Sequence, residues 1–181
     1  MFNTDSKILQ RIAPAIRRVL VVDPNSGSAR LTAELMKAMG ARQIAILLNG
    51  ERALMEVADF EPQLILTEIR GPGFDGLEFV HQLRHSDHAA RQAPVIMITS
   101  EATAASILGA RNAGAHEFLR KPYTAGDLFR RVENVTLKPR PWIQAQAYVG
   151  PDRRRFNSGE FVGSKKRQTD AERVERAAQA G

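Results

Sequence analysis

One strand, one turn and one helix are predicted by a single stretch, PQLILTEIRGPGFDGLEFVHQLR, at residues 62–84. Its apolar run at residues 64–66 is short and unbroken, which is typical of a strand buried on both faces of a parallel sheet. Glycine and proline follow at residues 71–73 and favour a turn. Apolar side chains then recur at helical spacing over residues 76–84. The stretch therefore predicts a strand that leads into a helix, which is the repeating unit of α/β folds.

Four more units of this kind surround the stretch. Short apolar runs lie at residues 19–22, 44–48, 95–98 and 118–119. Each is followed by a helical pattern, at residues 26–39, 51–60, 102–113 and 124–135. Five strand–helix units in succession predict a doubly wound α/β fold with a five-stranded parallel sheet and right-handed crossovers.

Composition divides the 181-residue chain into three parts. Residues 1–17 form an N-terminal extension whose sequence is compatible with a helix. Residues 18–137 contain all five strand–helix units. Residues 138–181 contain proline and glycine with little periodicity, so we expect a partly disordered tail. This tail carries ten Lys/Arg and five Asp/Glu, a net charge of +5 out of +6 for the whole chain. A nearly neutral body with a basic tail indicates an anionic partner for the tail, or a tail that is merely solvated.

Several classes of protein are excluded by composition. The chain has no cysteine, so disulfide scaffolds, thiolate metal sites and cysteine nucleophiles are ruled out. No apolar run approaches the roughly 20 residues of a membrane span, and we expect no membrane partner. The first residues lack the pattern of a signal peptide, so we expect a cytoplasmic protein.

Polar residues stand where four of the predicted strands end. Asp23 follows the first strand, Glu68 the third, Thr99 the fourth and Lys121 the fifth. Because the carboxyl ends of parallel strands share one edge of the sheet, we expect these side chains to converge there. Two carboxylates, a hydroxyl and a lysine are the groups that a magnesium-assisted phosphoryl-transfer site needs.

At this point residues 18–137 resemble the receiver domain of response regulators, the CheY-like family. The resemblance rests on VLVVDPN at 19–25, on the stretch at 62–84, on PVIMITSEA at 94–102 and on NAGAHEFLRKPY at 112–123. It implies a flavodoxin-like sheet with strand order 2-1-3-4-5 and a cis bond between Lys121 and Pro122. It also implies that Phe118 occupies the aromatic switch position that responds to Thr99. The alternative for Phe118 is a half-buried aromatic residue of the sheet.

Two positions depart from the family pattern. Receivers carry a phospho-accepting aspartate where this chain has Glu68, and usually two adjacent acids where it has Asp23 and Pro24. Magnesium demands near-octahedral oxygen ligands, so its binding here is doubtful. We therefore expect a non-enzymatic pseudo-receiver without a metal site or tightly bound cofactor. It would act through contacts of the receiver surface with other signalling or motor proteins.

Glu68 itself allows three interpretations. Its carboxylate could mimic an aspartyl phosphate, with a charge of −1 in place of about −1.5 to −2. It could instead form a structural ion pair with Lys121 that only marks the loss of phosphorylation. The third interpretation is a working glutamyl phosphate in a functional receiver.

The tail carries the second signal. Aromatic residues alternate with arginine clusters in WIQAQAYVGPDRRRF at 142–156 and FVGSKKR at 161–167. Arginine can form paired hydrogen bonds with phosphate or guanine, and aromatic rings can stack on bases. The segment resembles the arginine-rich tails of CheY-like proteins that bind cyclic di-GMP, which implies a set of ligand-binding residues: Arg153, Arg154, Arg155, Arg167, Tyr148 and Trp142. The alternative is that the aromatic residues pack on the domain while the arginines stay solvated. Nucleic acid is an unlikely partner, since no DNA-reading motif follows the receiver.

Overall fold

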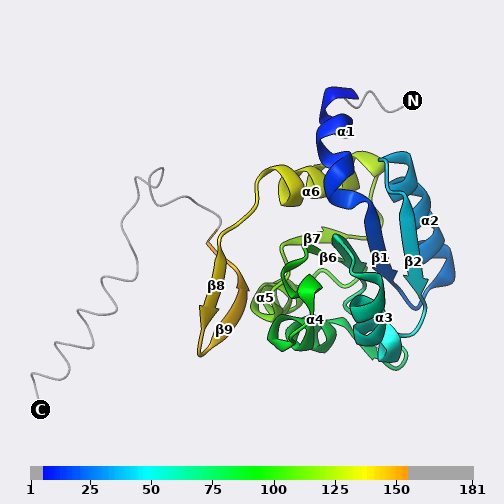
Figure 1. Ribbon diagram of the computed structural model, residues 1–181. Coiled ribbons are helices and arrows are strands. Elements are labelled where there is room, and N and C mark those ends of the chain that lie inside the picture. The colour runs from blue at the N-terminus through cyan, green and yellow to red at the C-terminus, as the bar shows by residue number, and fades with distance from the viewer. Residues whose placement is uncertain (1–5, 155–181) are drawn as a thin grey trace, which may run out of the picture.

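The computed structural model describes residues 6–154 and shows the predicted α/β architecture around one parallel sheet (Figure 1). The strand order is β2-β1-β3-β6-β7, which is the predicted order 2-1-3-4-5 in the numbering of the main-sheet strands. The strands are β1 (Arg18–Val22), β2 (Gln43–Leu47), β3 (Leu64–Thr67), β6 (Val95–Thr99) and β7 (Glu117–Arg120). All four pairings between neighbours are parallel, so the predicted fold class is confirmed.

Helices cover both faces of this sheet. One face packs against α1 (Ser6–Ile12), α2 (Ser26–Ala38) and α6 (Ala125–Leu137). The other face packs against α3 (Ala53–Phe60), α4 (Gly76–His85) and α5 (Ala104–Ala113). Short 3-10 segments η1 (Ala13–Ile16), η2 (Gly50–Arg52) and η3 (Ala89–Gln92) join these elements. The N-terminal extension is thus helical at residues 6–16 and contributes to the core.

Two predicted helix starts shift by two residues for local reasons. The helix predicted from residue 102 begins at Ala104, because the Thr103 hydroxyl accepts a hydrogen bond from the Ser106 N–H and caps the helix. The helix predicted from residue 51 begins at Ala53, since its first residues form η2.

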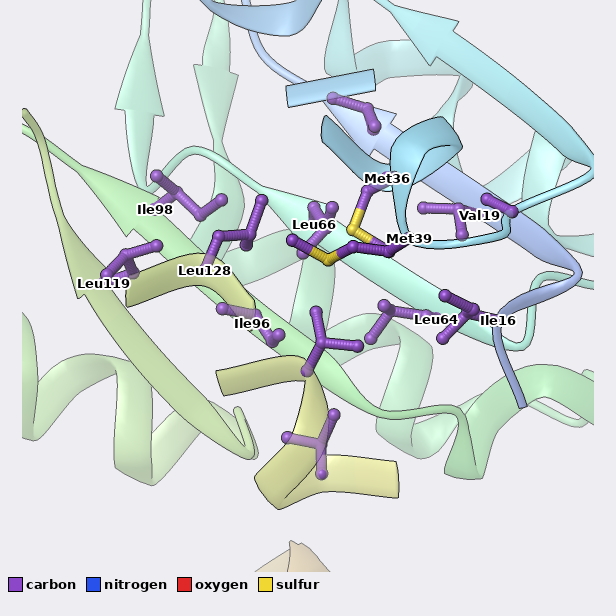
Figure 2. Close-up of a cluster of buried hydrophobic side chains, with 14 of the residues drawn as sticks. Ile16, Val19, Met36, Met39, Leu64, Leu66, Ile96, Ile98, Leu119 and Leu128 are labelled. Carbon is purple, nitrogen blue, oxygen red and sulfur yellow. The ribbon is translucent and has the colours of Figure 1, made fainter. Parts of the chain in front are cut away.

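The core consists of two clusters separated by the sheet. Strand side chains alternate between them, so Val19 and Val21 of β1 join one cluster while Leu20 and Val22 join the other. Figure 2 shows the first cluster, in which strand residues meet methionines of the α2 region and Leu128 of α6. Burial on both faces explains why the central strands β1, β3 and β6 read as unbroken apolar runs.

The first part of the basic tail is a hairpin, with antiparallel strands β8 (Trp142–Ala145) and β9 (Tyr148–Pro151). It docks at the C-terminal ends of α4 and α5. The side chain of Arg84 is fully buried, and its guanidinium lies 5.4 Å from the centre of the Trp142 ring. Tyr148 is buried and donates its hydroxyl proton to the Pro151 carbonyl at 2.7 Å.

A short antiparallel ribbon forms a second, separate sheet. Its strands are β4 (Arg70–Gly71) and β5 (Phe74–Asp75), directly after β3. Within residues 6–154, no helix combines the length and the apolar character needed to cross a bilayer.

Candidate functional site

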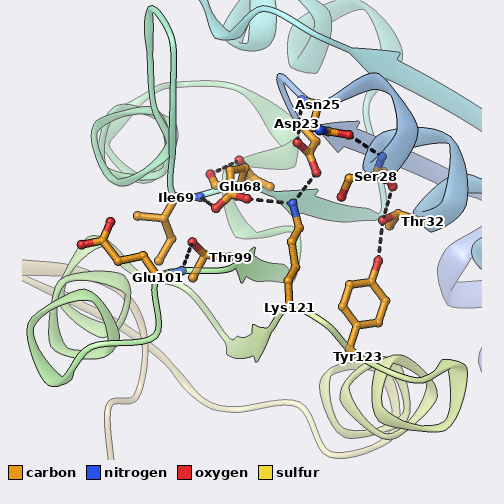
Figure 3. Close-up of polar contacts among 11 residues, drawn as sticks. Asp23, Asn25, Ser28, Thr32, Glu68, Ile69, Thr99, Glu101, Lys121 and Tyr123 are labelled. Atoms are coloured by element: carbon orange, nitrogen blue, oxygen red, sulfur yellow. Dashed lines mark hydrogen bonds and ion pairs between the residues drawn. The ribbon is translucent and has the colours of Figure 1, made fainter.

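The carboxyl ends of β1, β3 and β7 bring Asp23, Glu68 and Lys121 together, as predicted (Figure 3). The Lys121 ammonium donates to Asp23 Oδ2 and to Glu68 Oε2, each at 2.7 Å. All three side chains are largely buried, with 18% of Lys121, 8% of Asp23 and 9% of Glu68 exposed. One cation therefore neutralises one of two buried negative charges.

The pKa of Lys121 responds to this environment. Burial by itself would lower that pKa, but hydrogen bonds and charge from Asp23 and Glu68 outweigh burial and raise it. Lys121 is therefore a fixed ammonium. The Lys121–Pro122 peptide bond is cis, as the resemblance implied.

The remaining carboxylate oxygens are also occupied. The Asn25 backbone N–H donates to Asp23 Oδ1 at 2.9 Å, and the Ile69 backbone N–H donates to Glu68 Oε1 at 2.8 Å. Asn25 is held in place because its own side chain caps α2 through the Ser28 N–H. Each of the four carboxylate oxygens thus accepts a hydrogen bond.

This donor set does not fit a resident magnesium ion. Magnesium requires oxygens in near-octahedral geometry, and both acids here are tied to Lys121 and to backbone N–H groups. Pro24 adds no oxygen ligand from its side chain. No cluster of three or more His, Cys, Asp or Glu suited to a metal occurs within residues 6–154.

Close backbone packing surrounds the acids. A side chain at Gly76 would place its Cβ 2.0 Å from the Glu68 carbonyl oxygen, so α4 can approach β3 only with glycine there. A Cβ at Gly71 would lie 2.3 Å from Pro24 Cγ. The β4–β5 ribbon therefore packs directly on Pro24.

Neither Thr99 nor Phe118 joins the ion pairs: Thr99 ends β6, whereas Phe118 lies nearer the start of β7, where it pairs with Met97. Thr99 is buried, and its hydroxyl accepts a hydrogen bond from the Glu101 N–H at 3.2 Å. The Lys121 backbone N–H donates to the Thr99 carbonyl at 2.7 Å, but within residues 6–154 no hydrogen bond links the Thr99 hydroxyl to the side chain of Glu68 or Lys121. Phe118 is half-buried and packs against the cluster on the α3–α5 face.

One contact beside the site could not be predicted from the sequence. The Tyr123 hydroxyl lies 2.6 Å from the Thr32 hydroxyl of α2, which also donates to the Ser28 carbonyl. This bond ties the segment that follows Lys121 to α2. Two residues 91 positions apart carry no local pattern that could predict it.

The structure describes four of the predicted nucleotide-binding residues. The guanidinium of Arg153 stacks on the Tyr148 ring at 4.2 Å and donates to Asn112 Oδ1 at 3.2 Å. Arg154 is exposed and lies 3.9 Å from the Asp152 carboxylate. Trp142 and Tyr148 pack against the domain. Arg155 and Arg167 lie outside the described residues.

A family comparison agrees with this geometry. The model of the response regulator receiver domain matches residues 19–133, which is more than half of the chain. The chain belongs to the response regulator receiver family. Receiver domains generally interact with other signalling proteins, and the family belongs to two-component signalling.

Curated relatives of very different lengths match this chain. The chain is 27% identical over 118 residues to chemotaxis protein CheY-3 of Vibrio cholerae, a match that covers 65% of this chain and 90% of that protein. It is 33% identical over 121 residues to a protein-glutamate methylesterase/protein-glutamine glutaminase of Nocardioides sp.. That match covers 65% of this chain but only 32% of the methylesterase.

Solved structures show the same receiver fold. A receiver domain from Bermanella marisrubri is 28% identical, with a TM-score of 0.59 over 66% of this chain and 97% of that one. A response regulator described as putative, from Chloroflexus aurantiacus, has a TM-score of 0.63 at 23% identity, covering 68% of this chain and 99% of that chain.

Proposed function

We propose that this receiver is a non-enzymatic signalling module, a pseudo-receiver whose site is held by ion pairs in place of a phosphorylation cycle. The observation that carries the proposal is the double contact of Lys121 with Asp23 and Glu68, each at 2.7 Å. In this arrangement the cation that would meet an incoming phosphoryl group is already neutralised.

Acyl phosphate formation would need several of these contacts to break. A Glu68 oxygen would have to leave either Lys121 or the Ile69 N–H before it could attack phosphorus. The developing charge would also need a counter-ion, and both acids that could hold magnesium are engaged. These requirements support loss of the phosphorylation cycle, whether or not the Glu68 charge also mimics a phosphate.

Signalling without a phosphorylation cycle would act through protein contacts, and the exposed surface is compatible with this. Ile107 and Leu108 of α5 are 42% and 48% exposed, side by side on one helix. Large apolar patches mark surfaces that other proteins cover, and we propose that this pair forms part of such a surface. The partners we propose are other signalling or motor proteins.

Mass spectrometry after treatment with acetyl phosphate and magnesium tests the proposal. We expect no added phosphate on the wild-type chain. The double variant Pro24→Asp with Glu68→Asp restores the family's acids, and it serves as the matched comparison that should become labelled. A magnesium-dependent phosphoryl adduct on wild-type Glu68 would overturn the proposal.

A second candidate function is cyclic di-GMP binding by the arginine-rich tail. The observation that favours it is the exposed pair Arg153 and Arg154, set at the end of a hairpin that is anchored to the domain. Arginines on a hairpin that is already held against the domain lose less conformational entropy on binding than arginines on a free tail. Tyr148 is buried beneath Arg153, so in this candidate it supports the arginine and does not stack on a base.

A further inference from the structure

A groove lies far from the ion pairs, between the start of β7, the C-terminal part of α6 and the residues that lead to the hairpin. Its volume is about 320 Å³. Three of its residues, Arg131, Asn134 and Lys138, recur at spacings of three and four, which places them on one face of α6 and its cap. The full lining is His116, Glu117, Arg131, Asn134, Val135, Lys138 and Arg140.

Glu117 arranges two guanidinium groups around this groove. Its Oε2 accepts from Arg131 at 3.0 Å, and its Oε1 lies 3.5 Å from Arg140. Arg140 also donates to the carbonyl oxygens of His116 and Asp152. Both oxygens of the carboxylate are therefore engaged, and Arg140 is fixed before any ligand arrives.

The charge of the groove is positive. Lys138 is exposed, and within residues 6–154 no ion pair engages its ammonium. Burial, and then the nearby Arg84 and Arg140, lower the pKa of His116, so this ring adds no charge. Three cations face one carboxylate, which leaves an excess of two positive charges.

We propose that this groove binds a compact phosphate-bearing anion, with a pyrophosphate group as the matching chemistry. Guanidinium forks and an ammonium are the groups that proteins use to hold phosphate oxygens. The volume suits a small ligand. No Trp, Tyr or Phe lines the groove, so the recognition is directed at the phosphates and not at a base. The inference does not depend on the pseudo-receiver proposal, because the site is at the opposite end of β7.

Calorimetry of the full-length chain with inorganic pyrophosphate tests this site, at low and at near-physiological salt. Lys138→Gln removes a cation without breaking an ion pair. Arg130→Gln is the matched control, since Arg130 lies on the same helix, is 71% exposed and pairs with Asp127 outside the groove. We expect Lys138→Gln to weaken binding about tenfold, equal to about 1.4 kcal/mol. Arg130→Gln should leave binding nearly unchanged.

Other outcomes would overturn the proposal. Equal losses in the two variants would indicate general attraction of anions to a basic protein, and so would binding that vanishes at near-physiological salt. If Lys138→Gln lowers only the melting temperature, the cations merely complement the negative C-terminal end of α6. Absence of binding at millimolar pyrophosphate would also refute the site.

Discussion

Replacement of Lys121 by methionine is the sharpest test of the ion-pair site. Methionine keeps an unbranched side chain of similar length but removes the ammonium that Asp23 and Glu68 share. Two carboxylates would then remain buried at the end of the sheet with no cation between them. The remaining contacts of the site, to the backbone N–H groups of Asn25 and Ile69, would be unchanged.

The size of the effect follows from the geometry. Both carboxylate oxygens lie 2.7 Å from one nitrogen, so they are within about 5 Å of each other. Two like charges at about 5 Å repel by about 3 kcal/mol at an effective dielectric constant of about 20. Breaking a buried pair by removing one partner typically costs about 3–5 kcal/mol, which already contains this repulsion. We therefore expect Lys121→Met to lower the free energy of unfolding by about 4 kcal/mol and the melting temperature by about 10 °C.

Chemical denaturation at about pH 7 and pH 5 measures this loss and its cause. The deficit of Lys121→Met should shrink as the pH falls, because protonation of one carboxyl group removes both the repulsion and a buried charge. Glu68→Gln is the matched control. Its amide oxygen can accept from only one of the Ile69 N–H and Lys121, but Lys121 keeps Asp23 as its partner and no unpaired charge is left, so Glu68→Gln should cost less than Lys121→Met.

Two results would refute the reasoning. One is a denaturation midpoint for Lys121→Met that equals the wild-type midpoint at pH 7. The other is a deficit that stays the same at pH 5, because the loss would then reflect packing and not uncompensated charge. Either result would also weaken the proposed pseudo-receiver, which depends on Lys121 being committed to both acids.

Other parts of the chain give three further predictions. Burial, and then two nearby arginines, lower the pKa of His116, so only the unfolded chain takes up a proton there as the pH drops below about 6.5. As the pH drops below this value, the free energy of unfolding of the wild-type chain should decrease by up to about 1.4 kcal/mol per pH unit. Denaturant titrations of His116→Gln at several pH values should show a weaker dependence of this free energy on pH. A chain ending at Lys138 should still melt cooperatively, at a lower temperature because Tyr148 no longer packs on the domain; a broad calorimetric transition would contradict this boundary. Arg153→Ala should weaken cyclic di-GMP binding about ten- to a hundredfold in calorimetry while Arg130→Ala does not, and equal binding of an adenine dinucleotide would contradict specific recognition.

Local pattern explains why the sheet could be predicted from the sequence. The three central strands β1, β3 and β6 are buried on both faces, so each forms an apolar run that can be recognised without knowledge of its neighbours. The edge strands β2 and β7 are only partly buried, but their apolar runs were still visible in the sequence. Strand order then placed Asp23, Glu68 and Lys121 at one edge, because parallel strands end there together. The first residues of helices were predicted less accurately, because the spacing of apolar residues does not reveal a capping hydrogen bond such as that of Thr103.

Contacts between distant segments could not be predicted in this way. Arg84 stands in the last turn of α4, where an arginine usually faces solvent, yet its side chain is fully buried. It donates to the Gly114 carbonyl at 3.0 Å and to the Ala93 carbonyl at 3.0 Å, and Trp142 of the hairpin lies over it. The partners are up to 58 positions away, and only the assembled fold shows that an arginine at this point satisfies carbonyl groups at the ends of other elements.

The geometry also bears on whether Glu68 mimics a phosphate or only forms an ion pair. Mimicry that worked through the family's switch would require the Glu68 charge to engage the Thr99 hydroxyl. Within residues 6–154 the Thr99 hydroxyl accepts from the Glu101 N–H and has no hydrogen bond to Glu68, whose two oxygens accept from the Ile69 N–H and from Lys121. Lys121 thus faces Glu68 and Asp23 together, and the Glu68 carboxylate folds back to the N–H of the next residue. We therefore favour the structural ion pair over mimicry, and we expect any signal of this receiver to act through surfaces that do not depend on a change at Thr99.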